Sequence, residues 1–459
     1  MRLAIPGLAD RFVTASLGDA VVLLTAPALT LEGRRITCAL SLVTQTVTHE
    51  LEHGVTETRH TGPLADALPV TMTAVVRQRS GSPFARFRYE LDTESSCRIG
   101  VGADTQPEYL SLAIGPDAKA TAVRLGEFEE SVHSYHLTER PIRAEAFTLG
   151  FDEAGPILAV ECGGHTALLG YEHGATAPDT FLKYEFISTD GGVRSVRLVA
   201  VKGNVPGGTD ISRTPFQTVW FQVGLVDGGL DACAAAYRSF VLRDMSPNTA
   251  SRSPWVFYNT WNYQERNKHW HGKDYLDSMR QERMVQEIDV AGRMGIDTFV
   301  LDTGWYAKTG EWAVNPDRFD ADLATLRKML TDRGMKLGLW FSPGQSAVSA
   351  EITQAHLDCR CESDGKPWDA HPVWETEESY HMCLASRWWE AFADELIRLH
   401  REVGVTYFKW DAIQQYGCES PNHSHGMTDN TPQERRDCAA FEQVRYMAKI
   451  VDKVCASCP

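Results

Sequence analysis

Hydrophobic and polar residues alternate in short segments throughout the first half of the chain. Between residues 86 and 91, every second position is aromatic or aliphatic (Phe87, Tyr89, Leu91) and the positions between are charged. Segments 194–201 and 218–225 are rich in Val, Trp and Phe, and Gly, Pro, Asp and Asn cluster between such segments. A period of two is typical of strands with one buried face. We therefore predict that residues 1–245 form an N-terminal β-sandwich domain, closed by a helix over residues 231–242.

Residues 246–254 are rich in Ser and Pro and predict a linker. After the linker, short apolar segments alternate with helical patterns. The predicted strands are 256–261, 298–301, 336–341 and 405–410, and the predicted helices end at or near Gly295, Gly334 and Gly404. Repeated βα units build either a doubly wound sheet or a (β/α)8 TIM-type barrel. Because no Gly-rich nucleotide-binding loop follows any of these strands, we predict a barrel, of which residues 255–459 supply only the N-terminal half.

The last predicted helix has a strong start signal. Thr431 is suited to the N-cap, Pro432 to the first helical position, and Glu434 to the third position of a capping box. The helical spacing of Ala440, Val444, Met447, Val451 and Val454 predicts that these residues form its buried face.

The charge balance restricts the class of partner. The chain has 45 Lys and Arg residues against 61 Asp and Glu residues, a formal net charge of −16. This charge argues against nucleic acid and anionic membranes as partners. The first residues lack the apolar run of a signal peptide, and the apolar stretch 20–31 is too short to span a bilayer. We predict a cytoplasmic protein without a membrane segment, and self-association through the open edges of a half-barrel is plausible.

Eleven cysteines are too few, and odd in number, for a complete disulfide framework. The pairs Cys359/Cys361 and Cys455/Cys458 have the spacing of metal ligands. A structural zinc ion needs four ligands, so folding would have to add residues such as Cys383, His356 or Cys418. Reduced thiols and no bound metal are the expectation from sequence.

The ends of the four predicted strands carry the candidate chemistry. Each end contains a Trp residue, and the second and fourth ends also contain Asp302 and Asp411. Active sites of βα barrels lie at the carboxyl ends of the strands. Indole rings stack on sugar rings, while carboxylates and Lys bind sugar hydroxyls. The alternative is that these Trp residues only fill the barrel interior.

Four motifs, in order, resemble the catalytic barrel of glycoside hydrolase family 36, the α-galactosidase family and its relatives. They are residues 299–305, 310–319, 333–341 and 408–411. The resemblance implies a β-sandwich before the barrel and a retaining α-glycoside hydrolase that cleaves terminal α-linked galactose, or a related sugar, through a covalent glycosyl-Asp intermediate. It implies an oligosaccharide or α-galactoside as substrate and no metal or organic cofactor.

The resemblance also implies roles for individual residues. Asp411 corresponds to the nucleophile, and the ammonium group of Lys409 would favour its carboxylate form. Lys409 would bind a sugar hydroxyl, and Asp302 corresponds to the family's first sugar-binding Asp. The full set of residues expected to bind substrate is Asp302, Thr303, Trp305, Trp340, Lys409, Trp261, Trp312, Cys418 and His423.

The sequence departs from the family pattern at several positions. Thr303 replaces the second of two adjacent Asp residues that grip galactose, and residues 342–344 read Ser-Pro-Gly where the family continues with Glu-Pro-Glu. Residues 412–414 replace a Met-Asn-Arg that often follows the nucleophile. The family's acid/base Asp lies beyond the sixth strand, so we expect it to be absent from this chain. A retaining mechanism needs such a second carboxyl group, and Glu419, Glu311 and Asp429 are the loop residues that could supply one.

Two other functions remain open from sequence. A half-barrel without an acid/base could be a non-catalytic, vestigial sugar-binding protein. A galactosyl transferase of the same family would use the same covalent intermediate, and its acceptor preference cannot be read from these residues.

Overall fold

The computed structural model describes residues 15–17, 20–22, 26–40, 42–64, 68–102, 105–115, 117–129, 134–143, 146–147, 150–173, 180–188, 194–204, 207–246, 248–411 and 417–458. The chain divides into two compact units, Met1–Thr249 and Ala250–Pro459. The boundary falls within residues 246–254, which the sequence marks as a linker.

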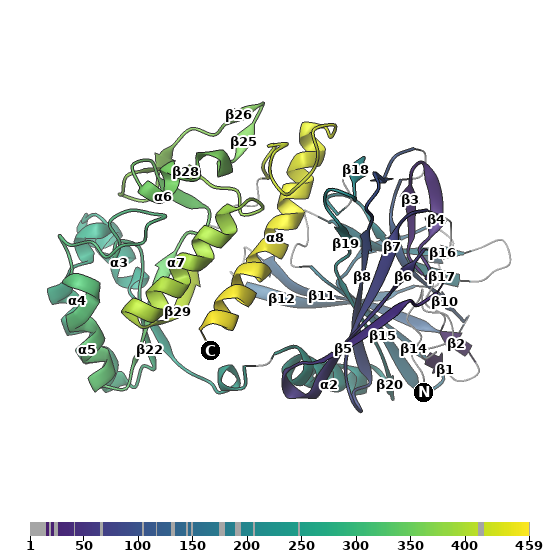
Figure 1. Cartoon of the computed structure of the whole chain (residues 1–459). Coiled ribbons are helices and arrows are strands. Elements are labelled where there is room, and N and C mark those ends of the chain that lie inside the picture. Colours follow the sequence, from purple (N-terminus) through teal and green to yellow (C-terminus); the bar gives the residue numbers. More distant parts are fainter. Residues whose placement is uncertain are drawn as a thin grey trace. The chain divides into compact units, whose positions relative to one another are not determined.

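The first unit consists of antiparallel sheets (Figure 1). The first sheet has the order β13 (Asp152–Ala154), β16 (Leu182–Ser188), β17 (Arg194–Ala200), β10 (Glu108–Ile114), β3 (Ala28–Leu31), β9 (Arg98–Ile99) and β18 (Thr209–Asp210), with β4 (Arg34–Thr37) paired to β3. The second has the order β12 (Ser134–Ile142), β11 (Lys119–Glu129), β14 (Ile157–Cys162), β15 (His165–Glu172), β20 (Trp220–Asp227), β8 (Phe84–Asp92), β7 (Thr71–Arg79), β6 (Val55–Pro63) and β5 (Gln45–Glu50), with β19 (Phe216–Gln217) paired to β8. A small pair comprises β1 (Ala15–Leu17) and β2 (Ala20–Val22).

Aromatic side chains from the two large sheets pack against each other. Tyr109 of β10 and Phe221 of β20 have ring centroids 5.4 Å apart, and Tyr184 of β16 lies 6.1 Å from Tyr171 of β15. On β8 the alternation places Phe87 in the interior and Arg88 over the outward-facing ring of Trp220. This two-layer packing confirms the sandwich-like arrangement predicted from the period of two.

Helix α2 (Leu230–Phe240) continues into a π-helical turn (Val241–Met245) and covers part of the second sheet. The ring centroid of Phe240 lies 5.2 Å from that of Phe84 on β8. The predicted closing helix is therefore confirmed. A short 3-10 turn, Glu52–Gly54, connects β5 and β6.

The second unit is built around a four-stranded parallel sheet. Its strands lie in chain order: β21 (Phe257–Asn259), β22 (Thr298–Leu301), β23 (Lys336–Phe341) and β29 (Val405–Trp410). The helices are α3 (Trp261–His271), α4 (Gln281–Met294), α5 (Ala324–Asp332), α7 (Trp388–Val403) and α8 (Pro432–Ser457). Short 3-10 turns are Ala250–Arg252, Leu276–Ser278 and Ala321–Leu323. Three of the four strands match the predicted ranges, and β21 is shorter than expected.

Glycines end two of the predicted helices as expected. Gly295 after α4 and Gly404 after α7 have φ angles of 76° and 75°. This left-handed conformation is favourable for glycine because it has no Cβ atom.

Helix α8 begins as predicted but turns a different face inward. The capping box of Thr431 and Glu434 is formed. The buried residues, however, are Cys438, Ala439, Phe441, Tyr446, Ile450 and Val454. Of the five residues predicted to be buried, only Val454 belongs to this set, and Val451 is 46% exposed. The prediction was wrong because it followed the aliphatic residues, whereas Phe441 and Tyr446 bury larger side chains on the neighbouring face.

An insertion between β23 and α7 contains short elements outside the parallel sheet. Strands β24 (Gln345–Ala347), β28 (Glu378–His381) and β27 (His371–Pro372) form one small sheet, and β25 (Glu362–Ser363) pairs with β26 (Lys366–Pro367). The helical pieces are α6 (Glu351–Gln354) and a 3-10 turn, Leu357–Cys359.

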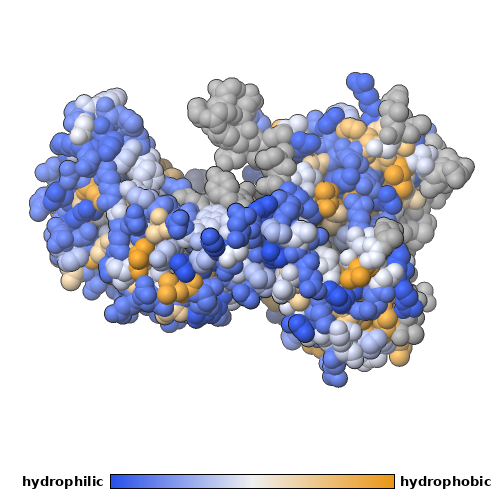
Figure 2. All heavy atoms as spheres, turned by 90° about the horizontal axis from the view of Figure 1, so that it is seen from above, coloured by the Kyte–Doolittle hydropathy of each residue, from blue (hydrophilic) through white to orange (hydrophobic). Residues whose placement is uncertain are grey.

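Hydrophilic residues cover most of the face seen in Figure 2, with hydrophobic residues in small groups. Among the helices of the described residues, none combines the length and the apolar character that a bilayer-spanning segment needs.

Candidate active site

The register of the parallel sheet brings the ends of β22, β23 and β29 to one edge. Trp340 of β23 pairs with Lys409 of β29, and the Asp411 N–H donates to the Phe341 carbonyl at 2.9 Å. The Asp302 N–H, just after β22, donates to the Thr260 Oγ1 at 2.9 Å. Residues far apart in the sequence thus meet at the carboxyl edge, where βα sheets bind ligands.

Lys409 joins the two carboxylates of this edge. Its Nζ lies 2.7 Å from the Asp302 Oδ2 and 3.8 Å from the Asp411 Oδ2. The Asp302 side chain is 2% exposed, whereas the Asp411 side chain is 47% exposed. We name Asp302, Lys409 and Asp411 the strand-end cluster. It offers one buried carboxylate that fixes the lysine and one carboxylate open to solvent.

Trp340 orients the open carboxylate. Its indole Nε1 donates to the Asp411 Oδ2 at 3.0 Å. The Trp340 ring is itself stacked on Tyr306, with centroids 5.9 Å apart, and its carbonyl accepts from the Trp305 Nε1 at 2.9 Å. Because Trp340 is fully buried and held on several sides, it presents its N–H to Asp411 in a fixed direction.

The tryptophans expected to stack on sugar differ in accessibility. Trp305, Trp312 and Trp340 are 0% exposed, and Trp305 stacks on Trp312 with centroids 6.2 Å apart. These rings cover one another, as expected for residues that fill the interior. Trp261 is partly exposed and stacks on Tyr275 at 4.9 Å. A role of these four residues in binding sugar stays a prediction.

Thr303 lies in a buried polar network next to Asp302. Its Oγ1 is 2.8 Å from the Tyr306 hydroxyl, and its carbonyl accepts from the Gln264 Nε2 at 2.9 Å. Its N–H donates to the Asp302 Oδ1 at 2.8 Å. Burial raises the pKa of Tyr306 above its ordinary value, so this phenol stays protonated and able to donate. No sequence pattern identified Tyr306 or Gln264, and only their closeness to the strand ends could have pointed to them.

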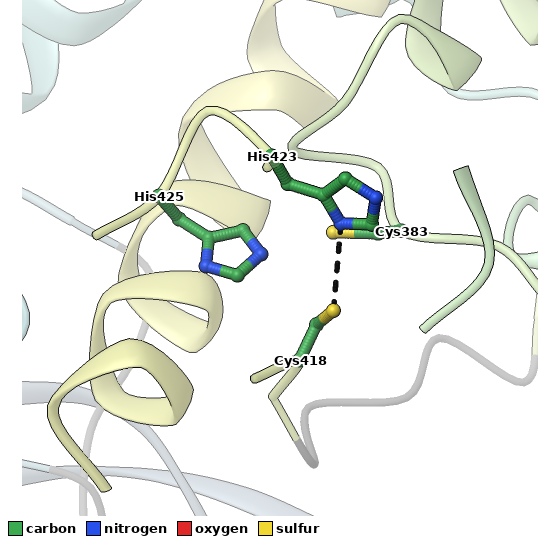
Figure 3. A group of neighbouring side chains, drawn as sticks. All are labelled: Cys383, Cys418, His423 and His425. Atoms are coloured by element: carbon green, nitrogen blue, oxygen red, sulfur yellow. Dashed lines mark hydrogen bonds between the residues drawn. The ribbon is translucent and has the colours of Figure 1, made fainter. Parts of the chain in front are cut away.

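Cys418 and His423 lie in a second group of side chains. Cys383, Cys418, His423 and His425 each offer a ligand atom, and these atoms all lie within 4.8 Å of one another (Figure 3). We name these four residues the thiol–imidazole cluster. Hydrogen-bonding contacts with the Cys361 and Cys383 thiols lower the pKa of Cys418. The sequence offered some of these thiols as conditional ligands but did not combine them with the two imidazoles.

Two of the three loop carboxylates considered as acid/base residues are engaged in structural contacts. Glu419 is 3% exposed, forms an ion pair with Arg436 and accepts from the Asp364 N–H at 2.7 Å. Glu311 accepts from the Glu351 N–H at 2.6 Å. Residues 412–414, which depart from the family pattern, lie outside the described residues.

Comparison with known proteins identifies the family. The melibiase family model matches residues 215–458, more than half of the chain. The chain belongs to the melibiase family, which is glycoside hydrolase family 36. The match begins within the antiparallel unit and runs through the parallel sheet, so it includes all three residues of the strand-end cluster.

The curated relatives of this chain are distant. It is 25% identical over 178 residues to the "A type blood alpha-D-galactosamine galactosaminidase" of Flavonifractor plautii, covering 37% of this chain and 16% of that protein. It is 22% identical over 205 residues to the alpha-galactosidase Mel36A of Lactobacillus acidophilus, covering 43% of this chain and 26% of that protein.

Solved structures of the family share the fold. Alpha-galactosidase AgaB of Geobacillus stearothermophilus matches with a TM-score of 0.63 at 15% identity, over 95% of this chain and 62% of that chain. AgaA of the same organism matches with a TM-score of 0.61 at 15% identity, over the same shares. The chain thus spans about three fifths of the length of these structures.

Proposed function

We propose that this chain carries the nucleophile and part of the sugar-binding site of a retaining α-glycoside hydrolase. The proposal rests above all on Asp411, whose half-exposed carboxylate is oriented by the Trp340 indole and lies 3.8 Å from the Lys409 ammonium group. A carboxylate that is oriented and open to solvent can attack the anomeric carbon and form a glycosyl-enzyme.

The sheet around Asp411 supports a barrel of the TIM type. Its four strands are parallel and lie in chain order, whereas a doubly wound sheet reverses its strand order at a switch point. We propose that this sheet and its helices correspond to the first four βα units of a (β/α)8 barrel.

Lys409 and Asp302 would recognise sugar hydroxyls. Lys409 has three N–H donors, and Asp302 occupies one of them. An incoming hydroxyl can accept from Lys409 beside Asp411 without displacing the buried Asp302. This arrangement would fix the sugar ring with its anomeric carbon near the nucleophile.

The substrate class is proposed from the relatives. Structures of AgaA carry raffinose or stachyose, which are α-galactosides, and the Flavonifractor plautii relative is a galactosaminidase. We propose an α-galactoside or a related α-linked amino sugar. Thr303 bears on this choice because its buried hydroxyl replaces the carboxylate expected there.

Covalent labelling tests the nucleophile without the acid/base. An activated α-glycosyl fluoride needs no protonation of its leaving group, so the glycosyl-enzyme can form without the help of an acid/base carboxyl group. We expect mass spectrometry to find one added glycosyl group on the peptide that contains Asp411. Labelling elsewhere, or binding of galactose without labelling, would reject the nucleophile and favour a non-catalytic sugar-binding protein.

A substrate panel tests the sugar. The three activated donors are the α-galactosyl, α-N-acetylgalactosaminyl and α-glucosyl fluorides. Faster labelling by either galactose-configured donor supports the proposed class, and faster labelling by the glucosyl donor contradicts it. Addition of a sugar acceptor after labelling separates the two activities, because a transferase forms a new glycoside whereas a hydrolase releases free sugar.

A further inference from the structure

The thiol–imidazole cluster is assembled from two segments that are distant in the sequence. Cys383 follows strand β28, whereas Cys418, His423 and His425 lie between β29 and α8. Cys383, Cys418 and His425 are 5%, 1% and 3% exposed. Two thiols and two imidazoles that meet in a buried place are a typical ligand set for zinc.

The spacing of the ligand atoms matches a tetrahedral zinc ion. The Cys418 Sγ and the His423 Nδ1 are 3.4 Å apart. With Zn–S near 2.3 Å and Zn–N near 2.0 Å, a tetrahedron places sulfur and nitrogen about 3.5 Å apart. The 4.8 Å limit on the whole set leaves room for an ion between the four atoms with small side-chain adjustments.

The surroundings prepare two of the ligands to bind a cation. The His423 Nε2 lies 2.8 Å from the Asp358 carbonyl oxygen. With the proton on Nε2, this nitrogen donates to the carbonyl and the Nδ1 lone pair faces Cys418. An N–H group that donates to a backbone carbonyl is the usual outer contact of a zinc-bound histidine. The Cys418 Sγ accepts from the N–H groups of Glu362 at 3.3 Å and Ser420 at 3.4 Å. Such donors stabilise a thiolate.

His425 supplies an independent sign of a missing ligand. Both of its ring nitrogens are buried and have no hydrogen-bond partner among the described residues. A buried polar group without a partner costs about 1–3 kcal/mol. In Figure 3 the His425 ring points toward the Cys418 sulfur and the His423 ring. A metal ion among these side chains would give one of the two His425 nitrogens a partner.

Backbone pairing explains how the cluster forms. The N–H groups of Cys361 and Cys383 donate to the carbonyls of His381 and Cys359, both at 2.8 Å. This antiparallel pairing brings the Cys361 thiol into contact with Cys383 and Cys418. The Glu419 N–H donates to the Glu362 carbonyl at 2.9 Å and so joins the loop that follows β29.

We propose that the chain binds one structural zinc ion through Cys383, Cys418, His423 and His425. Both sulfurs bind as thiolates, so the ion displaces any proton that they still carry, and the two thiolates balance the charge of Zn²⁺ without any redox step. Four protein ligands close the coordination sphere, so the ion cross-links the loop after Asp411 to the insertion before α7 and has no position for substrate. The Cys361 thiol lies beside the ion and is not a ligand.

Metal content of the tag-free 459-residue chain tests the proposal. After incubation with zinc and gel filtration, we expect about one equivalent of tightly bound zinc by mass spectrometry of the metal. Cobalt substitution should give the intense visible absorption of a tetrahedral site and the near-ultraviolet band of cobalt–thiolate bonds. A metal-free chain, or a cobalt spectrum without the thiolate band, would overturn the proposal independently of the zinc content of any variant.

Variants test the ligand assignment. Cys418→Ser and His425→Ala should lower the bound zinc at least tenfold, whereas Cys359→Ser, a buried thiol of the same insertion, should retain it. If His425→Ala retains zinc and Cys361→Ser loses it, the assignment of the fourth ligand is wrong. Circular dichroism shows whether each variant is folded. If a variant does not fold, the cobalt spectrum of the unmodified chain still tests the proposed site. A disulfide between Cys383 and Cys418 in the purified chain would also reject the site.

Discussion

The strand-end cluster and the thiol–imidazole cluster belong to the same unit but are positioned in different ways. Asp302, Lys409 and Asp411 each lie on a parallel strand or directly after it, so sheet register fixes their backbone positions. The four residues of the thiol–imidazole cluster lie outside helices and strands. A sheet edge can hold charged groups in place by itself, whereas the cluster carried by loops would be held together by the proposed zinc ion.

The sharpest test of the strand-end cluster is removal of its open carboxylate. Asp411→Asn should lower the rate of labelling by an activated glycosyl fluoride more than about 1,000-fold, because an amide is a far weaker nucleophile. Rates are measured by intact-protein mass spectrometry. Asp332→Asn is the control, since that carboxylate lies on the exposed surface of α5 in a pair with Lys328. Equal labelling of the two variants would mean that Asp411 is not the nucleophile.

Removal of the proposed zinc ion should affect the thiol–imidazole cluster and leave the strand-end cluster largely unchanged. Treatment with a strong chelator should raise hydrogen exchange in residues 417–425 and around Cys383 roughly 100-fold, which corresponds to about 3 kcal/mol of lost local stability. Protection in β22 and β23, which hydrogen bonds of the sheet maintain, should stay within a factor of about three. A uniform loss of protection over the whole unit would show that the loop cluster also supports the sheet.

Lys409→Met tests how the ion pair supports Asp302. The Asp302 carboxylate is almost fully buried, and the substitution leaves this charge without its cation. We expect the free energy of unfolding to fall by about 2–3 kcal/mol. The partial exposure of Lys409 limits this loss because water can reach the site. Urea denaturation measures it. Lys328→Met, which breaks an exposed pair on α5, should change the same free energy by less than about 0.5 kcal/mol.

The double variant Asp302→Asn with Lys409→Met tests whether the two side chains interact. Since it removes both charges together, it should be more stable than Lys409→Met alone. If the double variant loses as much stability as the two single variants added together, the two side chains do not interact.

Trp340→Phe should have the smallest effect. The loss of one N–H donor to the half-exposed Asp411 should slow labelling about fivefold, equivalent to about 1 kcal/mol. Trp388→Phe is the matched control, because it removes an equally buried indole N–H that donates to the Pro343 carbonyl at 2.9 Å. Similar rates for the two variants would mean that the Trp340 N–H does not orient the nucleophile.

The sequence predicted regular elements well where local signals agree. Strands β22, β23 and β29 were found from short apolar segments, and the ends of α4 and α7 from their glycines. The capping box of α8 was also predicted, but its buried face was not. The start of a helix depends on a few adjacent residues, whereas its buried face depends on what the rest of the chain packs against it.

The same division holds for the functional residues. The sequence alone marks Asp302, Lys409 and Asp411 as candidates, because strand ends of a parallel sheet share one edge and because these residues lie in recognisable motifs. The folded chain adds that Trp305, Trp312 and Trp340 cover one another, and that the Thr303 hydroxyl lies at hydrogen-bond distance from the Tyr306 hydroxyl. It alone brought Cys383 to Cys418, His423 and His425. Periodicity describes neighbours along the chain, whereas contacts between loops depend on packing that no local pattern encodes.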